Sequence, residues 1–147
     1  MIHYINENLL ESDCNLIVHG CNCFNTMGSG IARQLREKWP EVYEADCATI
    51  SGDMGKAGSF SLAKVAKGKV VVNLYTQYFY GQDRKYLDYY FIERGFKKVQ
   101  EEIVDKFPGL KLGMPKIGCG LAGGDWDVVE KIIDRIFDET YVYEYSP

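Results

Sequence analysis

Two glycine-rich stretches set the architecture expected of this chain: MGSGIA at residues 27–32 and IGCGLAGGDW at residues 117–126. Each follows a short apolar run typical of a buried strand and precedes a segment with helical spacing. Glycine lets backbone N–H groups approach a ligand without a Cβ in the way, and a helix N-terminus adds unpaired donors with a partial positive charge. Two such turns can hold one diphosphate between them, so we expect a negatively charged nucleotide as the ligand.

Length and composition narrow the class of protein. The 147 residues are expected to form one domain over residues 1–147, large enough to bury a substantial core. The 17 Lys and Arg residues against 21 Asp and Glu residues give a net charge of -4, so a nucleic acid polymer is not an expected partner. No apolar run approaches the ~18 residues of a membrane span, and the first residues lack the pattern of a secretion signal. Five cysteines without framework spacing indicate free thiols, so we expect a cytoplasmic protein with no membrane partner.

The pattern of apolar residues predicts alternating strands and helices. Strands are expected at residues 1–5, 15–19, 59–66, 69–76, 111–114 and 141–145, and helices at residues 31–39, 41–50, 87–107 and from residue 126 onward. Pro40 separates the first two helices, and Lys67-Gly68 joins residues 59–66 and 69–76 as an antiparallel hairpin. Because of this hairpin, we predict an α/β fold with a mixed sheet and helices on both faces.

The second stretch also fits the GxGxxG fingerprint of a Rossmann dinucleotide site. Only 24 residues follow Gly123, which is too few to complete a nucleotide-binding half or to supply the substrate domain of an oxidoreductase. The first stretch has Arg33 where a third glycine would stand, and neither stretch has the GK[ST] ending of a P-loop. Both classes are therefore disfavoured, and the plainer alternative is that the glycines only make tight turns.

Three segments together resemble a macro domain, the fold that binds ADP-ribose. They are HGCN at residues 19–22, the MGSGIA turn, and PKIGCGL at residues 115–121 followed by Trp126. The resemblance spans nearly the whole chain in matching order. It is strongest to the branch with the terminal ADP-ribose protein glycohydrolase and the yeast-type ADP-ribose 1''-phosphate phosphatase. It implies a three-layer α/β/α fold with a mixed sheet of about six strands.

The resemblance implies that backbone amides of both turns hold the diphosphate of ADP-ribose. The implied positions are Gly28, Ser29, Gly30 and Ile31 in the first turn and Ile117, Gly118, Cys119, Gly120 and Leu121 in the second. Asn8 matches the position of the family's group that reads the adenine, and Tyr143 would wall the adenine pocket. On residue type alone, Asn8 is equally suited to cap a helix or turn.

The resemblance is weaker at the catalytic positions. The catalytic lysine of the glycohydrolase falls at Gln77, which cannot form a covalent amine adduct with a sugar aldehyde, and its catalytic aspartate falls at Ala122. Asp125 is the nearest carboxylate, and we expect it to cap the last helix, to activate water as a general base, or to do both. Asn22 would orient the distal ribose, with Gln77 at the same end. His19 would polarise a phosphate or position water, although such a histidine often only hydrogen-bonds at a strand end.

Metal and thiol chemistry are not expected. His19, Cys21 and Cys23 alternate in a way suggestive of zinc, yet a fourth ligand is unassigned, so we expect no metal and no cofactor. Cys119 lies near a helix N-terminus, which lowers a thiol's pKa, but no histidine neighbours it. A packing role is the favoured interpretation of its side chain.

The sequence therefore predicts a domain that binds ADP-ribose and hydrolyses a group linked to C1'' of the distal ribose. That group would be a phosphate or an ester of a protein side chain, so an ADP-ribosylated protein is a possible partner. The alternative is a binding module that recognises ADP-ribose without turning it over, and the departures at Gln77 and Ala122 favour it.

Overall fold

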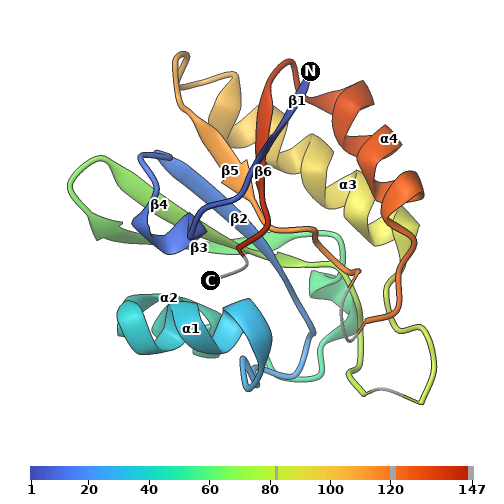
Figure 1. The fold of residues 1–147 in the computed structure, drawn as a ribbon. Coiled ribbons are helices and arrows are strands. Elements are labelled where there is room, and N and C mark those ends of the chain that lie inside the picture. Colours follow the sequence, from blue (N-terminus) through green and yellow to red (C-terminus); the bar gives the residue numbers. More distant parts are fainter. Residues whose placement is uncertain (82, 120–121, 146–147) are drawn as a thin grey trace.

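A six-stranded mixed sheet forms the centre of the computed structural model, which describes residues 1–81, 83–119 and 122–145 (Figure 1). The strands are β1 (Ile2–Ile5), β2 (Leu16–Cys21), β3 (Phe60–Ala66), β4 (Lys69–Tyr75), β5 (Leu112–Met114) and β6 (Thr140–Tyr143). Their order across the sheet is β1-β6-β5-β2-β4-β3, and only β3 pairs antiparallel to its neighbour. The predicted strands and the β3–β4 hairpin are confirmed.

Helices cover both faces of this sheet (Figure 1). They are α1 (Gly30–Lys38) and α2 (Pro40–Cys47) on one face, and α3 (Tyr89–Val99) and α4 (Trp126–Ile136) on the other. The predicted three-layer α/β/α arrangement is confirmed. Pro40 is the first residue of α2, where its missing N–H costs no helical hydrogen bond.

Alternation along the central strand divides the core into two halves. Ile17 belongs to the cluster that contains Leu35 of α1, whereas its neighbour Val18 belongs to the cluster that contains Phe96 of α3 and Ile133 of α4. All five side chains are fully buried. Because successive strand residues point to opposite faces, one apolar run serves both helix layers.

Helix and strand ends differ from the predicted ones by a few residues. The helix expected at residues 87–107 begins at Tyr89, and its last turn, Gln100–Val104, is a π-helix. Its interior Gly95 is explained by packing, because a Cβ there would lie 2.5 Å from Leu74 Cδ1 of β4. The last strand ends at Tyr143, opposite the end of β1 at Ile5, and not at Tyr145.

The central parallel strands direct their following loops to one edge of the sheet. β2, β4 and β5 run parallel, so the segments after Cys21, Tyr75 and Met114 all leave at the same edge. The first glycine-rich turn connects β2 to α1, and the second connects β5 to α4. Ligands of open α/β sheets bind at this edge. Among the described residues, no helix has the length and apolar character needed to cross a membrane.

Candidate functional site

A cleft of about 570 Å³ lies at this edge of the sheet, and both glycine-rich turns line it. Residues 27–32 of the first turn form part of its wall, and residues 115–118 with Ala122 form another part. Asn22, Gln77 and Tyr80 complete much of the rest. Stretches almost ninety positions apart in the sequence therefore share one cavity, as a ligand held from two sides requires.

The first turn is an unusual backbone segment that leads directly into a helix. Asn25 and Met27 have positive φ angles of 56° and 41°, and Gly30 follows with a φ of 58°. α1 begins at Gly30, and the Ser29 side chain makes no capping hydrogen bond. The first N–H groups of an α-helix have no intrahelical partner, so those of α1 can serve a ligand. Because Ser29, Gly30 and Ile31 line the cleft, this end of α1 suits an anion.

The second turn is closed by its own hydrogen bonds. The Gly124 N–H donates to the Gly118 carbonyl at 2.7 Å, and the Cys119 N–H donates to the Lys116 carbonyl at 3.3 Å. The Cys119 amide therefore already has a partner within the turn, and Cys119 does not line the cleft, whereas Ile117 and Gly118 do. Gly120 and Leu121 lie outside the described residues. Of the amides expected to hold the diphosphate, that of Cys119 is thus engaged within the turn, and the role of the others stays a prediction.

The Cys119 thiol also differs from expectation. Burial raises its pKa, which outweighs the lowering effect of the nearby Lys116 charge, and its Sγ donates to the Ile117 carbonyl at 3.4 Å. A lowered pKa near a helix N-terminus was the wrong expectation, because α4 begins only at Trp126. The side chain is a packing group, as its sequence context favoured.

Asn22 and Gln77 are held in place within the cleft wall. The Asn22 Nδ2 donates to Thr26 Oγ1 at 2.7 Å, and the Asn22 Oδ1 accepts the Phe24 N–H at 2.8 Å. The Gln77 Nε2 donates to the Phe79 carbonyl at 2.8 Å. A primary amide has two N–H groups, so each side chain retains a donor beyond these bonds.

Two further residues that line the cleft were not predicted from the sequence. Thr76 lines the cleft, and its buried hydroxyl has no hydrogen-bond partner among the described residues. Lys116 lines the cleft as well, where it forms an ion pair with Glu144. The available signal was position, because Thr76 directly follows β4 and Lys116 lies just after β5.

His19 lies inside the sheet and not in the cleft. Its ring is fully buried, and its Nε2 is 2.6 Å from Asn73 Oδ1 of β4. Burial lowers the pKa of His19 from 6.5 to about 4, although the bond to Asn73 opposes this shift. The imidazole is therefore neutral near pH 7 and does not line the cavity. The structure therefore places His19 against Asn73 of the neighbouring strand and not beside the other expected site residues, and its catalytic role stays a prediction.

Asp125 caps α4 and lies outside the cleft lining. Its Oδ1 accepts the Asp127 N–H at 2.9 Å, and its own N–H donates to the Tyr89 hydroxyl at 2.9 Å. The side chain is exposed. Of the two roles expected for Asp125, capping is confirmed, and the role of general base stays a prediction.

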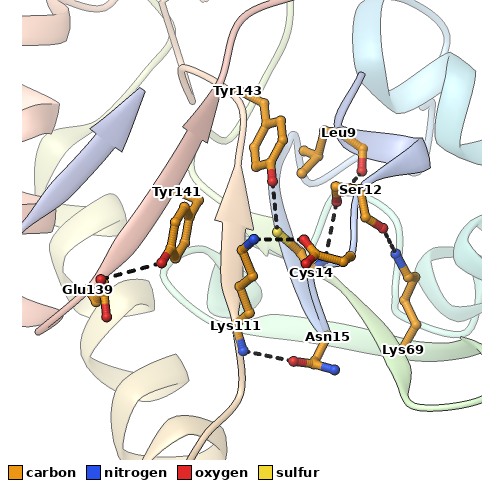
Figure 2. Close-up of polar contacts among 10 residues, drawn as sticks. Leu9, Ser12, Cys14, Asn15, Lys69, Lys111, Glu139, Tyr141 and Tyr143 are labelled. Carbon is orange, nitrogen blue, oxygen red and sulfur yellow. Dashed lines mark hydrogen bonds and ion pairs between the residues drawn. The ribbon is translucent and has the colours of Figure 1, made fainter. Parts of the chain in front are cut away.

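The two residues expected at the adenine also lie away from the cleft. Asn8 caps a 3₁₀ turn at Leu9–Glu11, where its Oδ1 accepts the Leu10 N–H at 3.0 Å. Tyr143 is buried, and its hydroxyl accepts a hydrogen bond from Cys14 Sγ at 3.5 Å (Figure 2). The capping interpretation of Asn8 is confirmed, whereas Tyr143 belongs to the core and not to a pocket wall.

A second hollow of about 590 Å³ lies at the ends of β1 and β6. It is lined by Tyr4, Ile5, Asn6, Lys116, Glu144 and Tyr145, so Lys116 borders both cavities. The Tyr4 hydroxyl donates to Glu130 and accepts from Trp126 Nε1 at 3.0 Å, which fixes this rim to α4. This hollow could not be predicted from the sequence, because it depends on the parallel pairing of the first and last strands.

Metal binding finds no support in the described part of the chain. No group of three or more His, Cys, Asp or Glu side chains there is arranged to hold a metal ion. Cys21 and His19 are close, with the Cys21 Sγ 3.6 Å from the His19 Nε2. Burial raises the pKa of the Cys21 thiol well above its ordinary value, which disfavours the thiolate that zinc requires.

Several proteins are similar to this chain in sequence. An uncharacterized 17.5 kDa protein of Enterobacteria phage T4 is 38% identical over 137 residues, which cover 89% of this chain and 86% of that protein. An ADP-ribose 1''-phosphate phosphatase of Candida glabrata is 30% identical over 97% of this chain and 98% of its own length. A DNA ADP-ribosyl glycohydrolase of Mycobacterium tuberculosis is 26% identical over 95% of this chain, which spans only 39% of that relative.

Solved structures share the fold. A Bacteroides thetaiotaomicron protein of unknown function superposes with a TM-score of 0.83 at 24% identity, covering 99% of this chain and 98% of that one. Thermosipho africanus DarTG in complex with ADP-ribose superposes with a TM-score of 0.76 at 19% identity, covering 99% of this chain and 41% of that one. The sequence model of the macro domain matches residues 18–133, which include both glycine-rich turns. The chain belongs to the macro domain family.

Proposed function

We propose that this chain binds ADP-ribose in the cleft and hydrolyses a group linked to C1'' of the distal ribose. The observation that carries the proposal is that both glycine-rich turns line one cavity, with the N-terminus of α1 at its wall. Backbone donors and a helix N-terminus are suited to a diphosphate. The names of the relatives agree, since they include an ADP-ribose 1''-phosphate phosphatase and a DNA ADP-ribosyl glycohydrolase.

The geometry supports one orientation of the ligand. The diphosphate would lie against Gly28–Ile31 and Gly118, with the Lys116 ammonium beside it. The adenosine end would enter the second hollow, where Tyr4 and Tyr145 offer aromatic surface. The distal ribose would then lie at the opposite end, toward the amides of Asn22 and Gln77.

Hydrolysis in this cleft would depend on positioned donors. Among its described lining residues there is no carboxylate and no histidine. The resemblance to the glycohydrolase aligns its catalytic lysine with Gln77, whose amide is not a nucleophilic amine. The oxygen of a water molecule would add to the phosphorus of a 1''-phosphate or to C1'', and the displaced group would leave with a proton. Asn22 and the turn amides would stabilise the charge that develops on the transferred group. The rate would then be modest, since no side chain with a suitable pKa activates the water.

A pure binding module is the second candidate, and the position of Asp125 favours it. The carboxylate expected to act as a base caps α4 outside the cleft. In this case the same two turns bind ADP-ribose, but the C1'' group is only recognised. The carrier of that group would be a protein, as the sequence suggested, or DNA, as the name of the glycohydrolase relative suggests.

Two measurements test these candidates in order. Calorimetric titration of the whole chain with ADP-ribose, with ADP and with ribose 5-phosphate tests binding, and we expect ADP-ribose to bind more tightly than either fragment. Absence of heat with ADP-ribose at millimolar concentration would refute the proposal. Release of phosphate from ADP-ribose 1''-phosphate, and of ADP-ribose from modified protein and modified DNA, then separates hydrolase from binding module. The cytoplasmic location stays a prediction.

A further inference from the structure

A buried lysine lies behind the first glycine-rich turn. Lys56 ends the 3₁₀ turn Met54–Lys56, and the residue is only 8% exposed. Its Nζ donates to Asn25 Oδ1 and to Thr49 Oγ1, both at 2.8 Å, and lies 4.9 Å from the centre of the Tyr75 ring. Lysine is rarely buried unless it is paired, because removing its charge from water is costly. These contacts indicate a specific use for the ammonium group.

One of the two residues that accept a hydrogen bond from Lys56 has an unusual backbone conformation. Asn25 has a φ of 56°, in the left-handed region that asparagine tolerates better than most residues. Contacts fix it from several sides: its Nδ2 donates to the Thr49 carbonyl at 3.1 Å, and its own carbonyl accepts from the Tyr43 hydroxyl at 3.2 Å. Lys56 completes this set by binding the side-chain oxygen.

The residues after Asn25 form the cleft wall and carry strain of their own. The Thr26 hydroxyl accepts a hydrogen bond from the side-chain amide of Asn22. Met27 has a φ of 41° although it is neither glycine nor asparagine. A left-handed conformation at such a residue is strained and persists only where neighbouring contacts hold it. Gly28 and the start of α1 follow at once, so the direction of their amides depends on this segment.

We infer that Lys56 is a positioning residue for the ligand site: acting through Asn25, it holds the first turn in the conformation that faces the cleft. Neither Lys56 nor Asn25 lines the cleft, so neither touches the ligand. The inference deepens the proposed function and rests on it for the ligand. Buried Asp46 lies in the same network, bonded to the Tyr75 hydroxyl at 2.7 Å, so the Lys56 charge also faces a carboxyl group.

The test compares two lysines with similar contacts. Lys56→Met keeps the stem and removes the donor. Lys69→Met is the matched control, because the Lys69 Nζ also donates to an oxygen, the Ser12 carbonyl at 2.7 Å (Figure 2). It also lies over an aromatic ring, that of Trp39. Lys69 is on β4 away from the cleft lining. Both variants lose a charged hydrogen bond, but only Lys56→Met should weaken ADP-ribose binding, by about tenfold or more.

A second readout does not depend on the ligand. Hydrogen exchange of the unliganded protein should become faster over residues 22–30 in Lys56→Met and remain unchanged there in Lys69→Met. Asn25→Gly keeps access to a positive φ but removes the amide, so it should reproduce the loss of affinity. The double variant with Lys56→Met and Asn25→Gly should bind ADP-ribose no more weakly than the weaker-binding of these two single variants. If Lys56→Met does not fold, Asn25→Gly and its exchange pattern provide the test.

The outcomes separate this inference from the proposed function. If the wild type does not bind ADP-ribose, the proposed function fails, and the exchange measurement still decides the role of Lys56. If the wild type binds and Lys56→Met binds equally well with unchanged exchange over residues 22–30, the positioning role is overturned. Equal loss of affinity in Lys56→Met and Lys69→Met would overturn it as well, since it would indicate general destabilisation.

Discussion

The two glycine-rich turns line the same cleft, yet their glycines are surrounded differently. In the first turn, a Cβ added at Gly30 would meet nothing within 4 Å, and one at Gly28 would meet only the Thr26 carbonyl at 3.9 Å. In the second turn, a Cβ at Gly118 would lie 2.4 Å from Leu87 Cδ1, and one at Gly124 would lie 2.3 Å from Leu87 Cδ2. The first turn is open toward the cleft, whereas the second is packed against the core.

The same residue type therefore meets two different requirements. At the first turn, the bare backbone faces empty space, so its glycines matter for what approaches from outside. At the second turn, the absence of a Cβ lets the turn fit against Leu87, so its glycines matter for folding. Substitutions in the first turn should change binding more than stability, and substitutions in the second should change stability first.

The largest effect is expected in the second turn. Gly118→Ala places a Cβ against Leu87 at a φ of 76°, so strain and overpacking add, and we expect a loss of about 2–5 kcal/mol in the free energy of unfolding. Urea denaturation measures this change. In a double-mutant cycle with Leu87→Ala, the Gly118→Ala loss should shrink, because the contact is then gone. An unchanged unfolding midpoint in Gly118→Ala would show that the second turn is not packed as described.

Much of this difference between the two turns could not be predicted from the sequence. The order of strands and helices followed from periodicity, because Ile17 and Val18 each face one helix layer and Pro40 divides two helices. The meeting of both turns in one cleft followed from their position after parallel strands. The contact between Gly118 and Leu87 joins residues far apart in the sequence, and local patterns carry no information on it.

The expected catalytic residues do not line the cleft for a similar reason. His19 was a reasonable candidate because it lies three residues before Asn22, but a strand alternates its side chains, and His19 points to Asn73 within the sheet. Asp125 was close in sequence to the second turn, yet the start of α4 uses its carboxylate as a cap. Lys116 and Thr76 reach the cleft only because of how neighbouring strands end there.

The strands that lead to the two turns predict a difference in pH dependence. β2 carries the buried His19 toward the first turn, whereas β5 consists of Leu112, Gly113 and Met114, which do not titrate. The pKa of His19 is near 6.5 when unfolded and about 4 when folded, so the unfolded chain binds the proton more tightly. The stability that His19 contributes is full above about pH 6.5 and is lost as the pH falls toward 4, by about 3 kcal/mol in total.

Urea denaturation between pH 4.5 and 8 measures this dependence. The variant His19→Gln keeps an amide that can bond to Asn73 and has no proton to gain, so its stability should fall less over the same range. Asp46 contributes with the opposite sign, because burial raises its pKa, and it is present in both proteins. Equal slopes for the wild type and His19→Gln would contradict the buried, neutral state of His19.

Binding should respond most cleanly at Gly28. Unlike Gly30, Gly28 does not have a positive φ, and there is room for an added Cβ. Gly28→Ala should therefore change the free energy of unfolding by less than about 0.5 kcal/mol. The added methyl group would keep a diphosphate from the backbone, and we expect ADP-ribose to bind about tenfold more weakly or worse. Calorimetric titration measures the affinity.

Gly30→Ala is the control within the same turn. It has equal room for a Cβ but a φ of 58°, so it should cost about 1–2 kcal/mol in stability in addition to affinity. If Gly28→Ala binds ADP-ribose like the wild type, the first turn does not approach the ligand. The two turns would then not differ in their importance for binding.

The smallest effect lies at Asp125, where the second turn gives way to α4. Asp125→Ala removes the acceptor for the Asp127 N–H and should cost about 1 kcal/mol of stability, whereas Asp125→Ser keeps a capping oxygen and should cost less. Because this side chain lies outside the cleft lining, neither variant should alter the release of phosphate from ADP-ribose 1''-phosphate at a temperature where both are folded. A general base would give the opposite pattern, since serine is as inactive as alanine in that role, and turnover would fall equally in both variants. If Asp125→Ala is less stable than Asp125→Ser, and both variants turn over substrate as fast as the wild type, this end of the second turn serves folding alone.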